Sequence, residues 1–411
     1  MWGDIAIAFI LAFVITFVCT PYTIKIAKKV GAVDIPKDKR RMHKKVMPKF
    51  GGPAVIMGVI ISVTYLAIIM SFENSINLFG EEQYFIKLIG LLLGTLILAG
   101  ACIVDDIKTI KPSAKLAAQV VAAIVVIAFG VRIEDIALPF IYTPELNLYV
   151  SYVITFLWII GVTNAINLID GLDGLSSGIS VISAVSLLII FVLNGSPLIS
   201  IILITALSGA LVGFLPFNFA PAKTFIGDTG SNFLGFAISI IAILGAAKTY
   251  TAAVIVLPLI VLGLPVVDTL WTIIRRIIKG KSLKAIFKAD KGHMHHRLVA
   301  RGLTQKQTVL VLYGISAIFG MFAIILFDSG IWKALSFLLI VLVAVASGYK
   351  NFKSERTGRE MFECLHCKYI YNPKFGNPKI GVKEGTSFDN LPEEWVCPVC
   401  GAGKDVFEIY E

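Results

Sequence analysis

The chain has few charged side chains. Asp, Glu, Lys and Arg make up 16% of its 411 residues, whereas about 25% is usual in a soluble domain. Hydrophobic residues make up 57%, and the mean hydropathy is +0.84. So little charge excludes a large soluble enzyme and indicates a polytopic membrane protein.

Acidic residues are scarcer than basic ones, with 27 Asp and Glu against 37 Lys and Arg, and the formal net charge is +10. From Met361 onward there are 5 Lys, no Arg and 8 acidic residues, so this tail carries −3 and the preceding part +13. A basic membrane body suits anionic lipid headgroups or a phosphate-rich substrate. Nothing in the sequence indicates a nucleic-acid-binding fold.

Cysteine is also rare, with six residues in the chain. Cys19 and Cys102 stand alone in apolar runs and are expected to be inert core residues. The other four form two C-x-x-C pairs near the C-terminus. Because thiolate metal ligands need a reducing compartment, we expect this tail in the cytoplasm. The N-terminus lacks a basic segment and a small-residue cleavage site, so the first apolar run is interpreted as a retained helix.

Long apolar runs fill the first 350 residues. They predict an all-α polytopic membrane protein with about 11 transmembrane helices, followed by a small C-terminal metal-knuckle domain. We place the membrane domain at 1–350, a linker at 351–360 and the tail domain at 361–411. The runs cover residues 5–24, 51–71, 86–104, 115–130, 150–169, 175–194, 198–215, 231–247, 251–271, 308–327 and 332–349.

The uneven distribution of Lys and Arg between loops predicts the orientation. Ten of them lie between Lys25 and Lys49, whereas the second loop holds three Glu and almost no cations. We therefore expect the first loop and the C-terminus in the cytoplasm and the N-terminus outside. This orientation brings four polar clusters to the cytoplasmic face, and it places outside the loops around Ile136, Gly195, Tyr250 and Asp328.

The first cluster is Asp105-Asp106, at the end of the third run. Adjacent carboxylates repel, which raises one pKa toward a range useful for a general base. Lys115, one turn into the next run, is suited to hold a phosphate. The alternative is a solvated helix end neutralised by Lys108 and Lys111.

The second cluster is N-A-I-N-L-I-D-G-L-D-G-L, from Asn164 to Leu175. Asn164, Asn167 and Asp170 share one helical face, and Asp173 follows in a glycine-broken turn. Such oxygen ligands suit Mg²⁺, which takes few protein ligands and shares the rest with water and substrate phosphates. A polar turn with Asx caps is the alternative.

The third cluster, F-I-G-D-T-G-S, precedes the eighth run. Asp228 or Ser231 is either a simple N-cap or, beside Asn167, part of a site where a helix N-terminus binds a diphosphate and its metal. Phe225 either stacks on a base or packs against the membrane body.

The fourth cluster contains His293, His295, His296 and Arg297. Apart from Asp290, no cysteine or carboxylate nearby completes a zinc site. Together with Lys291 and Arg301, these residues favour an anion clamp.

The motifs together resemble the polyprenyl-phosphate N-acetylhexosamine-1-phosphate transferase family over about residues 1–350. The resemblance depends on the order and spacing of H-x-x-x-x-P-x-x-G-G (from His43), D-D, N-x-x-N-x-x-D-G-x-D-G, F-x-G-D-x-G-S and H-x-H-H-R. It implies a membrane enzyme with its active site facing the cytoplasm. Such an enzyme moves a sugar-1-phosphate, most simply N-acetylglucosamine-1-phosphate, from a UDP-N-acetylsugar to undecaprenyl phosphate and releases UMP.

The resemblance also implies roles for individual residues. Asn167 and Asp228 would bind Mg²⁺ or Mn²⁺, and Asp105 would deprotonate or orient the lipid phosphate. Phe225 would stack on uracil. The predicted catalytic residues are Asp105, Asp106, Asp170 and Asp173, and the predicted substrate-binding residues are Lys115, Asn164, Phe225, His293, His295, His296 and Arg297.

Two other functions stay open at this stage. A phospho-N-acetylmuramoyl-pentapeptide transferase would share the fold, but that branch has a different basic loop, with H-H-F-E where this chain has H-H-R-L. A transporter or redox-sensing membrane protein would share only the architecture, and it would be supported by intramembrane charges in outward-facing segments, of which there are few. The sequence leaves open whether the protein forms a homodimer.

The tail resembles rubredoxin over about Met361–Glu411. Its ligands would be Cys364, Cys367, Cys397 and Cys400, since four thiolates form a tetrahedral site for iron or zinc. A 29-residue gap between the knuckles and several aromatics favour a rubredoxin with one iron over a zinc ribbon. Lys368 stands where the family usually has glycine, so it must adopt a left-handed backbone or alter the amide hydrogen bonds to sulfur. A redox partner for the tail is expected.

Overall fold

The computed structural model describes residues 2–36, 45–73, 82–134, 146–246, 256–280, 292–357, 361–373, 375–377 and 380–410. The chain divides into two compact units, Met1–Ala334 and Leu335–Glu411, which are treated separately below. The predictions that involve His43, Tyr250, Asp290 and Lys291 fall outside the described residues.

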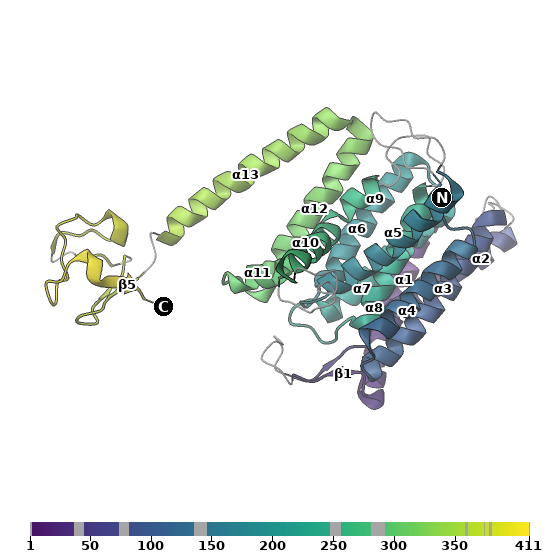
Figure 1. Ribbon diagram of the computed structural model, residues 1–411, viewed down its shortest axis with the longest axis horizontal. Helices are drawn as coiled ribbons and strands as arrows, with labels where there is room; N and C mark the ends of the chain where they lie inside the picture. Colours follow the sequence, from purple (N-terminus) through teal and green to yellow (C-terminus); the bar gives the residue numbers. More distant parts are fainter. Residues whose placement is uncertain are drawn as a thin grey trace. The chain divides into compact units, whose positions relative to one another are not determined.

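The first unit is a bundle of helices (Figure 1). In chain order these are α1 Trp2–Val30, α2 Gly51–Glu73, α3 Glu82–Ile107, α4 Pro112–Ala128, α5 Leu148–Ile169, α6 Leu175–Asn194, α7 Leu198–Asn218, α8 Gly227–Ala246, α9 Val256–Val261, α10 Gly263–Gly280, α11 Met294–Ala300 and α12 Gln305–Ser329. A short antiparallel pair, β1 (Val33–Asp34) with β2 (Met47–Pro48), connects α1 to α2.

Among the described residues, eight helices are long and apolar enough to cross a membrane: α1, α2, α3, α5, α6, α7, α8 and α12. Two shorter apolar stretches, Pro112–Ala128 and Ile331–Ser347, raise the candidates to ten. The described residues thus hold eight to ten span candidates where about eleven were predicted, and the remaining run, 251–271, begins outside them. The described part of the run at 251–271 comprises α9 and the start of α10, and hydrogen bonds from Leu262 N–H to Pro258 O at 2.9 Å and from Val266 N–H to Leu262 O at 3.1 Å connect the two helices.

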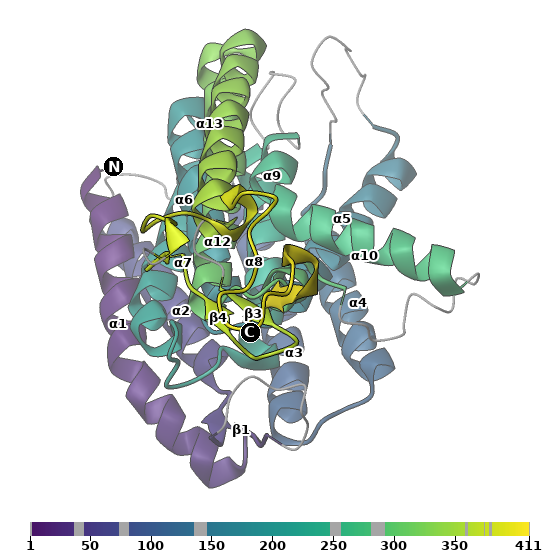
Figure 2. The same cartoon turned by 90° about the vertical axis from the view of Figure 1, so that its left-hand side faces the viewer.

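Helices α7 and α8 form the centre of the bundle. In the apolar stretch of α8, 94% of the residues are buried, compared with 22% in the corresponding stretch of α1. Helix α1 packs against α2 and α7 (Figure 2), α5 packs against α8, and α3 packs against both α4 and α8. Because a helix that is apolar on all sides belongs in the interior, the sequence of α8 suits its central place. Its N-terminus is consequently enclosed by the ends of other helices.

Glycines allow α2 to begin in direct contact with α8. A Cβ atom on Gly52 would lie 2.3 Å from the backbone nitrogen of Gly230. The backbone N–H of Gly52 donates to the carbonyl of Ile226 at 2.8 Å, and that of Gly51 donates to Phe225 at 3.1 Å. The G-G of the first motif therefore brings two helix N-termini together, a packing that only small residues permit.

The second unit contains most of α13 (Ile331–Thr357) and a small domain. Its three-stranded antiparallel sheet has the order β4 (Ile370–Tyr371), β3 (Phe362–Cys364), β5 (Phe407–Ile409). Two 3₁₀ turns, Phe388–Asn390 and Lys404–Val406, complete it. The core is aromatic, with Tyr371, Phe388, Trp395 and Phe407 all buried. Helix α13 continues to Thr357, so most of the segment at 351–360 is helical.

Candidate active site and metal centre

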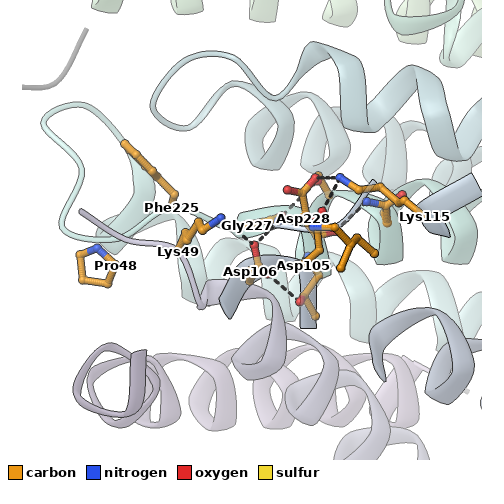
Figure 3. Close-up of polar contacts among 12 residues, drawn as sticks. Pro48, Lys49, Asp105, Asp106, Lys115, Phe225, Gly227 and Asp228 are labelled. Carbon is orange, nitrogen blue, oxygen red and sulfur yellow. Dashed lines mark hydrogen bonds and ion pairs between the residues drawn. The ribbon is translucent and has the colours of Figure 1, made fainter. Parts of the chain in front are cut away.

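The ends of four helices bring predicted residues of three clusters into one group. Lys115 Nζ of α4 lies 2.6 Å from Asp105 Oδ2 of α3 and 2.6 Å from Asp228 Oδ1 of α8 (Figure 3). Asn167 Nδ2 of α5 donates to the same Asp228 oxygen at 3.1 Å and to Ser231 Oγ at 2.8 Å. A single lysine thus links two carboxylates that are more than a hundred residues apart.

Asp105 and Asp106 face different neighbours although they are adjacent in sequence. Asp105 Oδ1 accepts the backbone N–H of Ile110 at 2.8 Å, and its other oxygen meets Lys115. Asp106 accepts the backbone N–H groups of Asp228 at 2.9 Å and Thr229 at 3.0 Å, and the Thr229 hydroxyl at 2.7 Å (Figure 3). Asp106 therefore caps the N-terminus of α8 from another helix, which satisfies amides that the helix itself leaves unpaired.

The predicted carboxylates of the second cluster also hold local structure. Asp170 ends α5 and accepts the Ser176 hydroxyl at 2.7 Å. Burial and, to a smaller extent, the charges of Asp228, Asp106 and Asp173 raise the pKa of Asp170 from 3.8 to about 7, against the lowering effect of the Ser176 hydrogen bond. Asp173 accepts the backbone N–H of Ala222 at 3.0 Å and so ties this turn to the segment before α8.

This donor set fits a hard divalent cation. Asp228, Asn167 and Asp170 offer carboxylate and amide oxygens, which Mg²⁺ prefers. Besides burial, the neighbouring carboxylates of Asp228, Asp106 and Asp173 raise the pKa of Asp170, and a cation would offset this negative charge. Binding of Mg²⁺ or Mn²⁺ by this group stays a prediction, and Asp228 Oδ1, which here accepts from Lys115 and Asn167, would have to exchange those partners for the cation.

Phe225 is held by the segment before α2. Its backbone N–H donates to Pro48 O at 2.8 Å, and the Thr224 hydroxyl donates to the same oxygen at 2.9 Å. Its ring is partly exposed near Lys49 and Gly227 (Figure 3). The first and third motifs are therefore joined by backbone hydrogen bonds, and stacking of Phe225 on a base stays a prediction.

The histidine cluster begins with a buried pair. His293 Nδ1 lies 2.8 Å from Asp268 Oδ2, and the backbone N–H of Met294 donates to the other Asp268 oxygen at 2.8 Å. Sequence reasoning missed Asp268, although an acidic residue within an apolar run is itself a signal of function. This contact orients the start of α11.

His295 connects this cluster to the second one. A Cβ atom on Gly171 would lie 2.3 Å from His295 Nε2, so the ring packs directly on the Asp170–Asp173 turn. Burial, together with the smaller effects of His296 and His293, lowers the pKa of His295 to about 3, so the ring is neutral near pH 7. His295 Nδ1 is buried and finds no hydrogen-bond partner within the described part of the chain. In an anion clamp, the positive charge would come instead from the exposed Arg297.

Two residues that sequence reasoning did not select complete the polar interior. Gln119 Nε2 donates to Asn232 Oδ1 at 2.7 Å, and Asn164 Nδ2 donates to Gln119 Oε1 at 2.8 Å. Each missed residue follows a predicted one by four positions, Gln119 after Lys115 and Asn232 after Asp228, and this spacing was the available signal.

The four tail cysteines form a metal site. Their sulfur atoms lie within 4.8 Å of one another, and the Cys364–Cys400 and Cys367–Cys397 sulfur pairs are 3.6 Å and 3.5 Å apart. Metal–sulfur bonds of about 2.3 Å in a tetrahedron require sulfur atoms about 3.8 Å apart. The cluster therefore fits a rubredoxin-type iron with little adjustment.

Lys368 adopts a left-handed backbone, with a φ of +62°, matching the +74° of Gly401 in the other knuckle. Each of these residues donates its N–H to a cysteine carbonyl at 2.9 Å, Lys368 to Cys364 and Gly401 to Cys397. Of the two possibilities raised by the sequence, the left-handed conformation is confirmed, and the knuckle keeps its shape without glycine.

The helical bundle, its polar cluster and the four-cysteine knuckle define a multi-pass membrane protein with an attached metal-binding domain. Residues 88–246 match the family model Glycosyl transferase family 4, and residues 361–407 match the Rubredoxin model. The chain is 38% identical over 340 residues to a probable undecaprenyl-phosphate N-acetylglucosaminyl 1-phosphate transferase of Bacillus subtilis, covering 82% of this chain and 89% of that protein.

Two further relatives extend the comparison. A decaprenyl-phosphate N-acetylglucosaminephosphotransferase of Mycobacterium tuberculosis is 28% identical over 84% of this chain and 88% of its own length. Rubredoxin-2 of Chlorobaculum tepidum is 54% identical over 12% of this chain and 92% of its own length. The chain therefore belongs to glycosyl transferase family 4, among the polyprenyl-phosphate N-acetylglucosamine-1-phosphate transferases, and it carries a C-terminal rubredoxin domain.

Proposed function

We propose that the protein transfers N-acetylglucosamine-1-phosphate from UDP-N-acetylglucosamine to undecaprenyl phosphate, releases UMP, and thereby initiates a cell-wall or surface polysaccharide. The observation that carries this proposal is the group formed by Lys115, Asp105, Asp228 and Asn167 beside the N-termini of α2 and α8. Both transferase relatives are named for N-acetylglucosamine, which supports the choice of sugar, and the Bacillus subtilis relative supports the choice of lipid.

The reaction is a single displacement at phosphorus. An oxygen of the lipid phosphate forms a bond to the phosphorus that bears the sugar. The bond from that phosphorus to the bridging oxygen of the UDP-sugar breaks, and UMP leaves with the electron pair. Positioning and charge compensation carry most of the catalysis in such reactions.

The protein's own groups divide this work. Lys115 would hold a substrate phosphate as a point charge, and the N–H groups at the start of α8 would favour the diphosphate. Asp105 would orient the lipid phosphate and accept its proton if it arrives protonated. His295 would give its unpaired Nδ1 to a hydrogen bond with the UDP-sugar. Asp106 would act by holding the N-terminus of α8 in place.

Asn167 and Asp228 would hold Mg²⁺ or Mn²⁺, with Asp170 beside them. When bound, the cation would offset the charge of two anionic substrates that otherwise repel each other. The orientation is part of the proposal too, with this face of the bundle and the rubredoxin domain in the cytoplasm. We further propose that the iron site serves one-electron transfer or regulation with a separate redox partner.

The test is turnover by the purified full-length protein with undecaprenyl phosphate and a panel of UDP-sugars, followed by UMP release. We expect UMP only when both substrates are present, with UDP-N-acetylglucosamine the best donor. A preference for the UDP-linked muramoyl pentapeptide would instead assign the protein to the peptidoglycan branch. No UMP from any donor would reject the transferase proposal.

A further inference from the structure

A second polar layer adjoins the group around Lys115. It consists of three amide side chains: Gln119 of α4, Asn164 of α5 and Asn232 of α8. Each lies about one helical turn, three or four residues, from a residue of the Lys115 group on the same helix. The same three helices thus supply both layers, through the pairs Lys115/Gln119, Asn167/Asn164 and Asp228/Asn232.

The hydrogen bonds in this layer fix the orientation of the Gln119 amide, whose Nε2 donates to Asn232 Oδ1 at 2.7 Å and, at 3.5 Å, to Asn164 Oδ1. Asn232 Nδ2 donates to the backbone carbonyl of Asp228 at 2.8 Å, which turns Asn232 Oδ1 toward Gln119. Gln119 must therefore present its NH₂ group to Asn232 and its oxygen to Asn164. Asn164 Nδ2 donates to that oxygen at 2.8 Å and also to the carbonyl of Ile160 at 2.8 Å. Reversing the Gln119 amide would set oxygen against oxygen and NH₂ against NH₂.

Burying the polar side chain of Gln119 at this position costs free energy unless it is hydrogen-bonded. It is 2% exposed, Asn232 is fully buried, and every residue of α4 after Gln119 is apolar. An amide in such surroundings is tolerated only when its donor and acceptor are both paired. Both groups of Gln119 are paired, each to a different helix. It therefore connects α4 to α5 and α8 at the level just below Lys115.

We propose that Gln119 is a positioning residue for the transfer reaction: it fixes α4 against α5 and α8 so that Lys115 is aimed at Asp228. The reaction named here rests on the proposed function, whereas the contacts do not. Among the hydrogen bonds described, Gln119 bonds only to Asn164 and Asn232, and it acts on the reacting groups through them. A displacement of Lys115 by about 1 Å is enough to lower turnover about a hundredfold.

The substitution Gln119→Glu gives a specific test. The carboxyl group that it introduces can, while protonated, still donate to Asn232 and accept from Asn164, but once ionised it would set oxygen against Asn232 Oδ1. The titratable groups around Lys115 are Cys102, Asp105 and Asp106 from α3 and Asp228 from α8, while the polar side chains that α5 supplies here are the amides of Asn164 and Asn167. Gln119→Glu should therefore work best at low pH and lose activity relative to wild type as pH rises.

The experiment measures UMP release by the full-length protein across a pH series for wild type, Gln119→Glu and Gln119→Leu. We expect Gln119→Leu to lower kcat about tenfold or more at every pH, since it leaves two buried amide groups unpaired. We expect Gln119→Glu to approach wild type only at low pH, and KM for the UDP-sugar to change little. Trp158→Phe is the matched control, because it removes another α5–α8 hydrogen bond, from Nε1 to Ser239 O at 3.0 Å.

A second measurement does not depend on the reaction. Lys115, paired with two carboxylates, should react slowly with an acylating reagent, and mass spectrometry should find it several-fold more reactive in Gln119→Leu. If the wild-type protein released no UMP, only the proposed function would be rejected. The reactivity of Lys115 would still test whether Gln119 positions it. Wild-type kcat or unchanged Lys115 reactivity in a folded Gln119→Leu would overturn the proposal, as would equal, pH-independent losses in both variants. Should Gln119→Leu melt during purification, Gln119→Glu compared at two pH values supplies the same decision.

Discussion

Replacing Gly52 with alanine should disable the site without altering any polar side chain. The added Cβ atom would lie 2.3 Å from the backbone nitrogen of Gly230 and 2.6 Å from its Cα, closer than the 3.4 Å at which ordinary contact begins. Both obstructing atoms belong to the backbone, so no side chain can rotate away. Helix α2 or the start of α8 must move.

The cost of that movement follows from what the start of α8 holds. Asp106 binds the N–H groups of Asp228 and Thr229, so a shift of α8 weakens the cap and displaces Asp228 from Lys115. Overpacking of this kind costs about 1–3 kcal/mol in stability. A misplacement of about 1 Å at a reacting group costs about a hundredfold in rate. We therefore expect kcat/KM to fall about a hundredfold, while the protein stays folded and membrane-bound.

The assay is UMP release by Gly52→Ala, compared with Gly100→Ala. Gly100 lies in α3, five residues before Asp105, and a Cβ atom there would meet nothing within 4 Å. Gly100→Ala should keep wild-type activity and a similar melting temperature. If Gly52→Ala turned over as fast as Gly100→Ala, the contact between the two helix N-termini would not control the site, and the reasoning would be refuted.

Four further outcomes are expected. Asp228→Ala should abolish turnover in a folded protein, as should excess chelator; substantial activity in either case would remove the metal assignment. Because the pKa of Asp170 is raised, its contribution to stability is fully present below about pH 4 and is lost as pH rises toward about 7. Asp170→Asn should therefore make the melting temperature less dependent on pH across that range. A pH profile identical to that of wild type would contradict the shift. In intact cells, an impermeant thiol reagent should label a cysteine placed at Gly195 but not one placed at Lys45, and the reverse pattern would invert the orientation. Purified full-length protein should show thiolate-to-iron charge-transfer absorption that Cys364→Ser abolishes, and a colourless zinc-only protein from iron-replete cells would reject the iron site.

The sequence came close to predicting the candidate site because its residues stand in short motifs at helix ends. Asp105, Lys115, Asn167 and Asp228 each sit where an apolar run begins or stops, and charged groups in such places have few structural uses. The sequence was less informative about the end of α10, because the predicted apolar run stops at residue 271 whereas the helix continues to Gly280. Hydropathy follows the apolar residues, and it falls where Arg275 and Arg276 begin although the helical backbone continues.

By itself, the sequence determined which chemistry is present and in what order along the chain. Apolar runs too long for a soluble core determined the helical membrane body, and four thiolates at knuckle spacing determined the tail site. These features depend on composition and local spacing, which a linear sequence contains in full.

Only the tertiary structure decided how the groups share their work. In the structure, Asp106 caps the N-terminus of α8 and Asp105 forms an ion pair with Lys115, although the two carboxylates are neighbours with the same chemistry. It paired His293 with Asp268 and placed Gln119 between two amides from other helices. These assignments depend on which helix faces which, and that is settled by the packing of small residues such as Gly52 against Gly230 across long sequence separations.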